Sequence, residues 1–358
     1  MDETDSRRFG RRAFVAAAAS VAVAGCSSEG GTTAEVDSSG GSTSEAGGSP
    51  EQAATDTATA TESSETETTE PEQGAQSASV AVGEVVEDDS LAMVVRGVEK
   101  TTNIGEFQES DSGNTYVVVE MAVKNKSSSE FVDFNSFWQT RLKDDANHVY
   151  DQTIAVTDSS MQSGQLAPGE VSRGDVVYEI PKDASGLSMQ FDFSSFDLFS
   201  FNRVTVDLAS TASNVADLSQ NLAVDVHSAG DTVSKENLQV TLHGSRTETE
   251  LGSFTQAEDG NRYVIPDISV KNDTGEPLSV SIALQMLVKD GTGRAYTADI
   301  GGLSALDQAF AQGSEIAADE TRRGEVAYQV PEDAGELFFA FEFSLLADGD
   351  KTFWSLSP

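Results

Sequence analysis

The side chains that could carry chemistry in this 358-residue chain are few and widely separated. His148, His227 and His243 are its three histidines, and none has the spacing of a metal-ligand pair. Its single cysteine excludes a disulfide framework and any metal site built from several thiolates. The chain also lacks a Gly-x-Ser-x-Gly elbow, a Walker loop and a dinucleotide-binding glycine motif. We therefore predict a protein that is not an enzyme, with no catalytic residue, no cofactor and no metal.

Carboxylates are abundant, and two short acidic turns could offer oxygen ligands to calcium. These are Asp144-Asp145-Ala146-Asn147 and Asp290-Gly291-Thr292-Gly293. Neither has the twelve-residue loop with a closing glutamate that a calcium-binding helix–loop–helix requires. We expect solvated β-turns at both positions, with a weak calcium site as the alternative.

Four aromatic residues lie close together in the sequence at Phe131, Phe134, Phe137 and Trp138. We expect them to fill the core of a domain. The alternative is an exposed aromatic platform for a sugar or a peptide. Trp354, four residues from the C-terminus, is a weaker candidate of the same kind.

Two sequons mark candidate sites of N-glycosylation, Asn125-Lys126-Ser127 and Asn272-Asp273-Thr274. Both directly follow a run that reads as a strand, so we expect Asn125 and Asn272 to lie in exposed turns. The alternative is that Asn followed by Ser or Thr simply favours a turn.

The first 26 residues have the features of an export and anchoring signal. Arg11-Arg12 lies in Gly-Arg-Arg-Ala-Phe-Val, which resembles the twin-arginine export motif, and Arg7-Arg8 is a second pair. An apolar stretch of 13 residues follows, too short to span a bilayer. It ends in Val23-Ala24-Gly25-Cys26, which resembles a lipobox.

The lipobox predicts cleavage before Cys26 and lipidation of its thiol. Two lipid chains suffice for stable anchoring. We therefore expect residues 1–25 to be a signal peptide and the mature protein to be anchored to the outer face of the cytoplasmic membrane. An uncleaved signal anchor is the alternative.

Residues 26–77 are expected to form a disordered stalk. The stretch 27–79 is rich in Ser, Thr, Gly, Ala and Glu, with eleven acids, no base and no aromatic residue. Such a composition cannot bury enough apolar surface to offset the entropy of ordering it.

The net charge of −38, from 60 acids and 22 bases, excludes a general nucleic-acid binder. Residues 80–358 alone carry 46 acids and 18 bases, a net charge of −28. Molar salt shortens the Debye length to about 3 Å and removes most of the resulting repulsion. Together with the twin-arginine motif, this acidity resembles that of lipoproteins secreted by halophilic archaea.

The rest of the chain matches itself, which predicts a duplicated domain. We place repeat 1 at residues 78–208, a linker at 209–221 and repeat 2 at 222–358. The offset between matched residues is 147 at first and 150 later. Matched runs include Gly113-Asn114-Thr115-Tyr116 with Gly260-Asn261-Arg262-Tyr263, and Arg173-Gly174-Asp175-Val176-Val177-Tyr178 with Arg323-Gly324-Glu325-Val326-Ala327-Tyr328.

Within each repeat the apolar residues alternate as in strands. Val117, Val119, Met121 and Val123 share one face. Pro266 takes the place of Val119 in repeat 2, which predicts an edge or bulged strand there. Only the spacing of Leu303, Leu306 and Phe310 suggests a short helix. Short strands separated by turns predict an all-β fold of two antiparallel immunoglobulin-like sandwiches.

The order of these motifs is similar to that of telokin-like, immunoglobulin-like ectodomains on bacterial and archaeal lipoproteins, a family of unknown function. The likeness rests on a Gly-(Glu/Asp)-x-Val turn, a Val-Lys-Asn strand end, and the run Arg-Gly-x-Val-x-Tyr-x-(Ile/Val)-Pro, and it covers residues 78–208 and 222–358. It implies a fold and a cellular place. It transfers no catalytic residue.

We expect a non-enzymatic cell-surface lipoprotein that serves binding, adhesion or envelope organisation, with a surface protein or a glycan as partner. The first alternative is an accessory subunit that presents a solute or metal to a membrane transporter. The second is an extracellular hydrolase whose site is not recognisable in the sequence.

Overall fold

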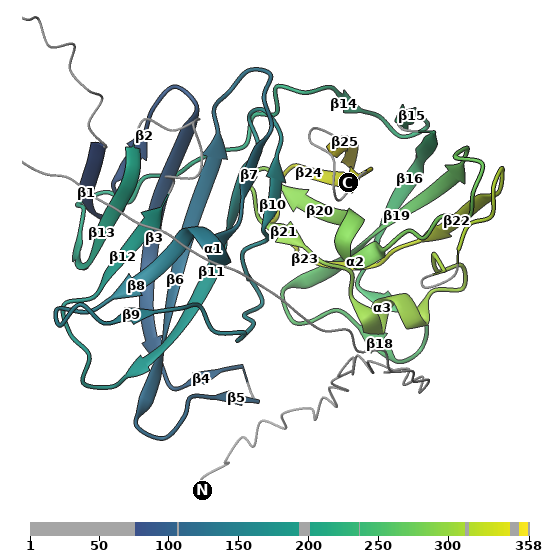
Figure 1. The fold of residues 1–358 in the computed structure, drawn as a ribbon. Coiled ribbons are helices and arrows are strands. Elements are labelled where there is room, and N and C mark those ends of the chain that lie inside the picture. Colours follow the sequence, from purple (N-terminus) through teal and green to yellow (C-terminus); the bar gives the residue numbers. More distant parts are fainter. Residues whose placement is uncertain are drawn as a thin grey trace, which may run out of the picture. The chain divides into compact units, whose positions relative to one another are not determined.

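The fold is all-β, with two tandem immunoglobulin-like sandwiches, each built from two facing sheets (Figure 1). The computed structural model describes residues 76–105, 107–192, 201–235, 237–311, 315–343 and 351–356. The predicted signal peptide and nearly all of the predicted stalk lie outside these residues. No helix among the described residues has the length and apolarity needed to cross a bilayer.

Repeat 1 contains one main sheet in the strand order β1-β13-β12-β8-β9 and a second in the order β11-β6-β3-β2. Two small pairs, β10-β7 and β4-β5, complete it. Its elements are β1 (Gln76–Val82), β2 (Val85–Glu87), β3 (Leu91–Thr101), β4 (Asn103–Ile104), β5 (Gln108–Glu109), β6 (Asn114–Asn125), β7 (Val132–Phe134), α1 (Ser136–Gln139), β8 (Thr140–Lys143), β9 (Val149–Tyr150), β10 (Gly164–Leu166), β11 (Val171–Pro181), β12 (Ser188–Asp192) and β13 (Phe201–Thr211).

Repeat 2 repeats this plan with the orders β14-β25-β24-β20-β21 and β15-β16-β19-β22, and β23 also pairs with β19. The pair β17-β18 corresponds to β4-β5. Its elements are β14 (Val226–His227), β15 (Thr232–Lys235), β16 (Leu238–Glu248), β17 (Glu250–Leu251), β18 (Thr255–Gln256), β19 (Asn261–Asn272), α2 (Ile282–Gln285), β20 (Met286–Asp290), β21 (Ala295–Tyr296), α3 (Ile300–Ala305), β22 (Thr321–Glu325), β23 (Tyr328–Pro331), β24 (Leu337–Glu342) and β25 (Lys351–Leu356).

The predicted alternation places the core of repeat 1 between its two sheets. Val117, Val119, Met121 and Val123 of β6 are all fully buried there. Side chains of β11 and β12 pack against them from neighbouring and facing strands, among them Tyr178. A separate core fills repeat 2, so each sandwich has its own apolar interior.

The first strand of each repeat pairs in parallel with the last, which differs from a purely antiparallel prediction. β1 lies beside β13 over its whole length, from Gln76 opposite Phe201 to Val82 opposite Thr211. In repeat 2 the matching pair joins only two residues of β14 to β25. The other strand pairs of the main sheets are antiparallel.

Pro266 does not place its strand at an edge, so that part of the prediction is wrong. β19 lies between β16 and the β22/β23 side of its sheet. The proline, which has no N–H to donate, falls where the partner strand is interrupted between Glu325 and Tyr328. A bulge opposite β19, between Leu242 and Gly244, has a counterpart in repeat 1 between Val95 and Gly97, so it does not come from the proline.

The predicted short helix forms as α3, capped by Asp299, whose side chain accepts a hydrogen bond from the N–H of Gly302. It includes Leu303 but ends before Leu306 and Phe310. Two further one-turn helices, α1 and α2, were not predicted, because four residues are too few for a helical pattern to show.

The segment predicted as a linker packs against the repeats. β13 extends to Thr211. Leu218 is buried with Ala92, Val94 and Ala122 of repeat 1. The N–H of Gln220 donates to the carbonyl of Gly291 in repeat 2. The segment therefore joins the repeats through contacts as well as through the chain.

Candidate functional site

The aromatic cluster divides between the core and the surface. Phe134 is buried, as expected, and Phe131 is partly buried. Phe137 and Trp138 on α1 are exposed, with 71% of the surface of Trp138 accessible. Their ring centroids lie 5.9 Å apart with the planes at 76°. The expectation that Trp138 fills the core is therefore wrong, and the alternative, an exposed aromatic surface, describes this pair.

Hydrogen bonds at its N-terminus hold α1 in place. The side chain of Asn135 accepts from the N–H groups of Phe137 and Trp138, and the N–H of Asn135 donates to Gln139 Oε1 at 2.7 Å. Ser136 and Gln139 are buried on the opposite side of the turn. The geometry of the turn thus makes Phe137 and Trp138 point outward.

Repeat 2 has the same turn without the aromatic pair. Ser281 caps α2, and its N–H donates to Gln285 Oε1 at 2.9 Å. Leu284 takes the place of Trp138 and is also exposed. Trp354, in contrast, is fully buried in the core of repeat 2, with its indole N–H on the carbonyl of Asp231. Trp354 is therefore not part of an exposed platform.

A buried cluster of charges joins the two repeats. Glu170 is fully buried directly before β11 and accepts hydrogen bonds from Lys289 Nζ and, at 2.8 Å, from Lys351 Nζ, both of repeat 2. The other carboxylate oxygen accepts from the N–H of Ala167 at 2.8 Å. The two ammonium groups also donate to repeat 1 carbonyls, those of Val171 and Gln165.

Burial and pairing oppose each other in this cluster. Burial alone would raise the pKa of Glu170, but the two ammonium groups hold it below its ordinary value. Desolvation lowers the pKa of Lys289 to about 8 despite the attraction of Glu170. A buried carboxylate flanked by two buried ammonium groups is stable only while all three partners are present. The cluster therefore fixes the contact between the repeats.

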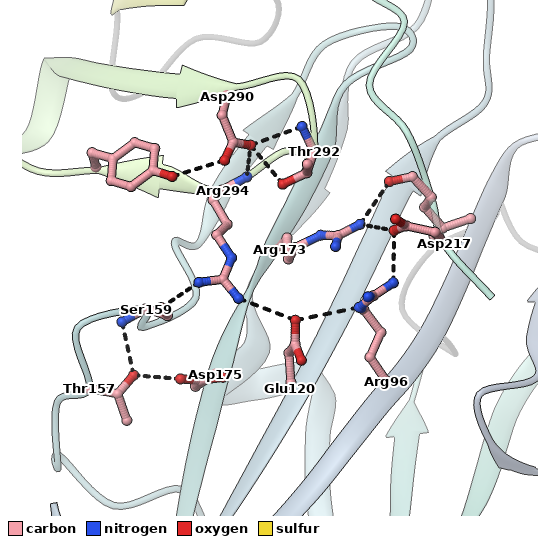
Figure 2. A network of polar contacts seen from close by, with 12 residues as sticks. Arg96, Glu120, Thr157, Ser159, Arg173, Asp175, Asp217, Asp290, Thr292 and Arg294 are labelled. Carbon is pink, nitrogen blue, oxygen red and sulfur yellow. Dashed lines mark hydrogen bonds and ion pairs between the residues drawn. The ribbon is translucent and has the colours of Figure 1, made fainter. Parts of the chain in front are cut away.

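A second polar network, closer to the surface, extends the junction (Figure 2). Arg294 of repeat 2 donates to Ser159 Oγ at 2.8 Å and to Glu120 Oε1 at 3.3 Å. Glu120 also pairs with Arg96, which reaches Asp217 of the linker segment at 2.7 Å. Figure 2 shows the guanidinium of Arg294 lying between Ser159 and Glu120, so this network links three parts of the chain.

Apolar contacts complete the junction on the outer face of β24 and β25. Phe338, Ala340 and Phe353 pack there with Ala167 of repeat 1. The matched positions in repeat 1 are polar, with Ser188 in place of Phe338. Only repeat 2 can therefore bury this face of its sheet against a neighbour.

A small pocket of about 100 Å³ lies beside the buried charges. Ser163, Gln165 and Ser172 of repeat 1 line it, as do Leu284 and Lys351 of repeat 2. Pockets that hold metabolite-sized ligands usually have volumes of about 300 Å³ or more. The pocket thus suits water or a very small molecule.

The two acidic turns use their carboxylates internally. Asp144 accepts from the N–H and ring of His148 and from Tyr150 Oη, and these bonds lower its pKa to about 2 against the opposing effect of desolvation. Asp290 accepts from Thr292, from the N–H of Arg294 and from Tyr296 Oη. In both turns the first aspartate is buried and hydrogen-bonded within the turn, whereas Asp145, Ala146, Asn147 and Thr292 are exposed as predicted.

The three histidines lie apart in the structure as well. His148 contacts Asp144, the ring of His227 lies 5.7 Å from that of Trp354, and His243 Nε2 lies 2.9 Å from Ser269 Oγ. Each has a different neighbour in a turn or on a strand. Among the described residues, no group of three or more His, Cys, Asp or Glu side chains is placed to hold a metal ion.

The sequon asparagines do not lie in exposed turns, so that prediction is wrong. Asn125 and Asn272 are fully buried at the ends of β6 and β19. The amide group of Asn125 donates to the carbonyls of Glu130 and Leu166, and that of Asn272 to Glu276 and Ile316. In the folded protein both amide nitrogens are engaged in fixing a loop.

The predicted lipidation and export residues, Cys26, Arg11 and Arg12, lie outside the described residues. Their roles remain predictions.

A family model for a domain of unknown function, DUF4352, matches the chain twice, over residues 80–217 and 227–351. The chain belongs to this family. Its members share a domain to which no function is assigned, so membership supplies no ligand and no reaction.

Several solved structures are similar to parts of the chain. A conserved hypothetical protein from Bacillus anthracis is 18% identical over 32% of this chain and 87% of its own, with a TM-score of 0.29. An uncharacterised β-sandwich protein from Clostridium difficile 630 is 17% identical over 37% and 95%, with a TM-score of 0.28. The secreted protein MPT63 from Mycobacterium tuberculosis is 10% identical over 37% and 98%, with a TM-score of 0.29. No curated protein matches.

Proposed function

We propose that this β-sandwich protein is a non-enzymatic cell-surface lipoprotein, held at the outer face of the cytoplasmic membrane by a lipidated Cys26, that binds an envelope glycan through Phe137 and Trp138. The exposed pair on α1 is the observation that carries the proposal. Binding would serve adhesion or envelope organisation.

Physical chemistry favours a glycan as the ligand of this surface. An indole face offers a large apolar area at little cost in side-chain entropy, and aromatic side chains are enriched where proteins bind partners. A neutral sugar can approach a domain of formal charge −13 without electrostatic penalty. The junction supports such a role, because it fixes repeat 1 against repeat 2 while α1 keeps its aromatic side chains exposed.

No specific observation favours the two alternative functions, a transporter accessory subunit and an extracellular hydrolase. A pocket of about 100 Å³ is small for presenting a solute to a transporter. The polar groups that converge at the junction bind one another in ion pairs, which leaves them poorly placed for hydrolysis. We therefore retain binding as the function.

The two tryptophans make a selective test possible, because Trp138 is exposed and Trp354 is buried. Acrylamide quenching of the full chain should report mainly on Trp138. We expect oligosaccharides released from the surface glycans of the source organism to protect the fluorescence of Trp138 from quenching by acrylamide. Trp138→Ala should abolish binding to the immobilised glycan, while Leu284→Ala, at the matched position of repeat 2, should retain it.

Unchanged quenching at saturating glycan would contradict the proposal. Protection by peptides from envelope proteins, and not by glycans, would assign the site to a protein partner.

A further inference from the structure

Each repeat carries a pair of large exposed apolar side chains at matched positions, away from α1 and α2 in the sequence. Phe107 and Phe254, 147 positions apart, lie in the turns of the small hairpins and are 69% and 98% exposed. Ile154 and Ile300, 146 positions apart, are 87% and 78% exposed. The same kind of side chain is thus exposed at the same place twice.

In repeat 1 the two segments are fastened to each other. Ile104 of β4 is buried and anchors the hairpin to the sandwich. The side chain of Gln108, next to Phe107, bonds both backbone groups of Val156: it donates to the carbonyl at 2.9 Å and accepts from the N–H at 3.0 Å. The hairpin tip and the segment that carries Ile154 therefore form one surface, which we call tip 1.

Repeat 2 builds the equivalent surface, tip 2, with other contacts. Leu251 of β17 is buried in a cluster that includes Ala305 of α3. Gln329 bridges the two segments, because its side chain donates to Asp299, the cap of α3, and accepts from the N–H of Glu258, two residues after β18. Ile300 is the first residue of α3.

The backbone of the two tips differs where the isoleucines lie. Ile154 lies outside any helix or strand, whereas Ile300 begins a helix. The isoleucine is thus exposed at the matched position both in a loop and in a helix, so its exposure does not follow from one type of local backbone structure. Large apolar side chains gathered on a surface mark sites that bind a partner.

Charge indicates what kind of partner fits. The described residues of the tip segments 102–112, 151–160, 247–260 and 298–308 include ten acids and no Lys, Arg or His. Three arginines from outside these segments contact them: Arg141 pairs with Asp151, Arg246 pairs with Glu248, and Arg294 donates to Ser159. The acids of the tips still outnumber these arginines, so both tips keep an excess of negative charge. A partner surface that matches these tips would have apolar side chains at its centre, to pack against the exposed Phe and Ile, and basic side chains around them, to pair with the acids.

We propose that tips 1 and 2 are a duplicated docking surface for a basic polypeptide whose contact residues are apolar side chains flanked by lysine or arginine. Two equivalent tips on one chain allow two such segments to bind at once, which strengthens the attachment of a partner that carries both.

The test uses calorimetric titration of the full chain, at the lowest salt concentration at which circular dichroism shows it folded, with a synthetic helical peptide that has Leu on one face and Lys on the other. We expect two peptides per chain. Phe107→Ser should remove one of the two sites, and Phe107→Ser/Phe254→Ser should weaken binding at least tenfold at both. Both phenylalanines are exposed, so circular dichroism should show an unchanged fold.

Two controls distinguish binding at the tips from nonspecific binding of the peptide. The first is the same peptide with Glu in place of Lys, which should not bind. The second is Val149→Ser/Val226→Ser, which changes one exposed valine per repeat elsewhere and should leave binding intact. Equal binding of the Glu peptide, equal loss in the valine variant, or no binding by the unmodified chain would each overturn the proposal. Tip-dependent binding to lipid vesicles without peptide binding would replace it with a membrane contact.

Discussion

Tyr178 and Tyr328 lie 150 positions apart at matched places in the two cores, but only one has its hydroxyl satisfied. Tyr178 Oη shares a 2.6 Å hydrogen bond with Thr140 Oγ1. Tyr328 Oη is buried without a hydrogen-bond partner in the part of the chain that the structure describes. Met286 stands in repeat 2 where Thr140 stands in repeat 1, so repeat 2 has no hydroxyl at this position to pair with the tyrosine.

This difference predicts opposite effects for the same substitution. Tyr328→Phe removes an unsatisfied buried hydroxyl and should leave stability unchanged or raise it by about 1 kcal/mol. Tyr178→Phe breaks a satisfied bond and should lower it by about 1 kcal/mol. Denaturant unfolding of both variants gives the comparison. Equal losses in the two variants would show that Tyr328 Oη has a partner.

Removing the charge of Glu170 should destabilise the contact between the repeats. Glu170→Gln leaves two buried ammonium groups without a counter-charge, which should cost about 3–5 kcal/mol. Glu320→Gln is the matched control, because Glu320 is exposed and makes the same loop bond to the N–H of Ala317. Its effect should stay within about 0.5 kcal/mol. Similar effects of both substitutions would remove the special role of the buried cluster.

The same carboxylate predicts part of the response to acid. The pKa of Glu170 is lower in the folded than in the unfolded state, so its contribution is complete above the unfolded value of about 4.5. The contribution is lost as the pH falls toward the folded pKa. Unfolding free energies measured between pH 5 and about 2 should therefore fall less steeply in Glu170→Gln than in the unmodified chain. If the unfolding free energies of Glu170→Gln and of the unmodified chain fell equally steeply with pH, titration of Glu170 would not account for this part of the acid response.

Anchoring by lipid predicts that Cys26→Ser releases the protein from the membrane. The protein should move to the soluble fraction after cell fractionation, since the lipid chains supply the attachment. Retention of Cys26→Ser in membranes after high-salt and carbonate washing would favour the uncleaved signal anchor.

Replacing Arg11 and Arg12 together by Lys should block export, because the twin-arginine route depends on both guanidinium groups. Normal secretion of that variant would point to Arg7-Arg8 as the operative pair or to another export route.

Screening should govern the stability of both repeats, which carry formal charges of −13 and −14 over residues 78–208 and 222–358. Lowering the salt from molar to about 0.01 M lengthens the Debye length from about 3 to about 30 Å, so like charges across each sandwich repel. We expect repeat 2, where Pro266 coincides with the interrupted partner strand, to unfold first. Hydrogen exchange followed by mass spectrometry resolves the repeats, whereas the exposed Trp138 would not report the core of repeat 1. Stability that is independent of salt would contradict the prediction.

The sequence was informative wherever a pattern is local. Alternation along β6 and the internal offsets predicted the strands, the two cores and the all-β class, because side chains in a strand repeat every two residues. The exposure of Trp138 could not be predicted this way, since it depends on a four-residue helix fixed by a hydrogen bond from the N–H of Asn135 to Gln139 Oε1. The burial of Asn125 depends on carbonyls as distant as Leu166, which no local pattern records.

The junction was missed although one signal was available. Repeat 1 reads Leu-Ser-Met-Gln-Phe at residues 187–191, as a strand with one solvent face does, while repeat 2 reads Leu-Phe-Phe-Ala-Phe at 337–341. A continuous apolar run indicates a strand covered on both faces. The ion pairs of Glu170 join residues more than 100 positions apart, and only the folded structure brings them together.

The parallel pairing of β1 with β13 determines how the protein would respond to mechanical force. The chain enters β1 at Gln76 and leaves β13 at Thr211, at opposite ends of two strands that run side by side. Tension along the chain would therefore load these strands in shear, and their hydrogen bonds would have to break together. The matching pair in repeat 2 joins only two residues, Val226 and His227, to β25. Force applied between the two ends of the chain should thus unfold repeat 2 first, while repeat 1 stays folded.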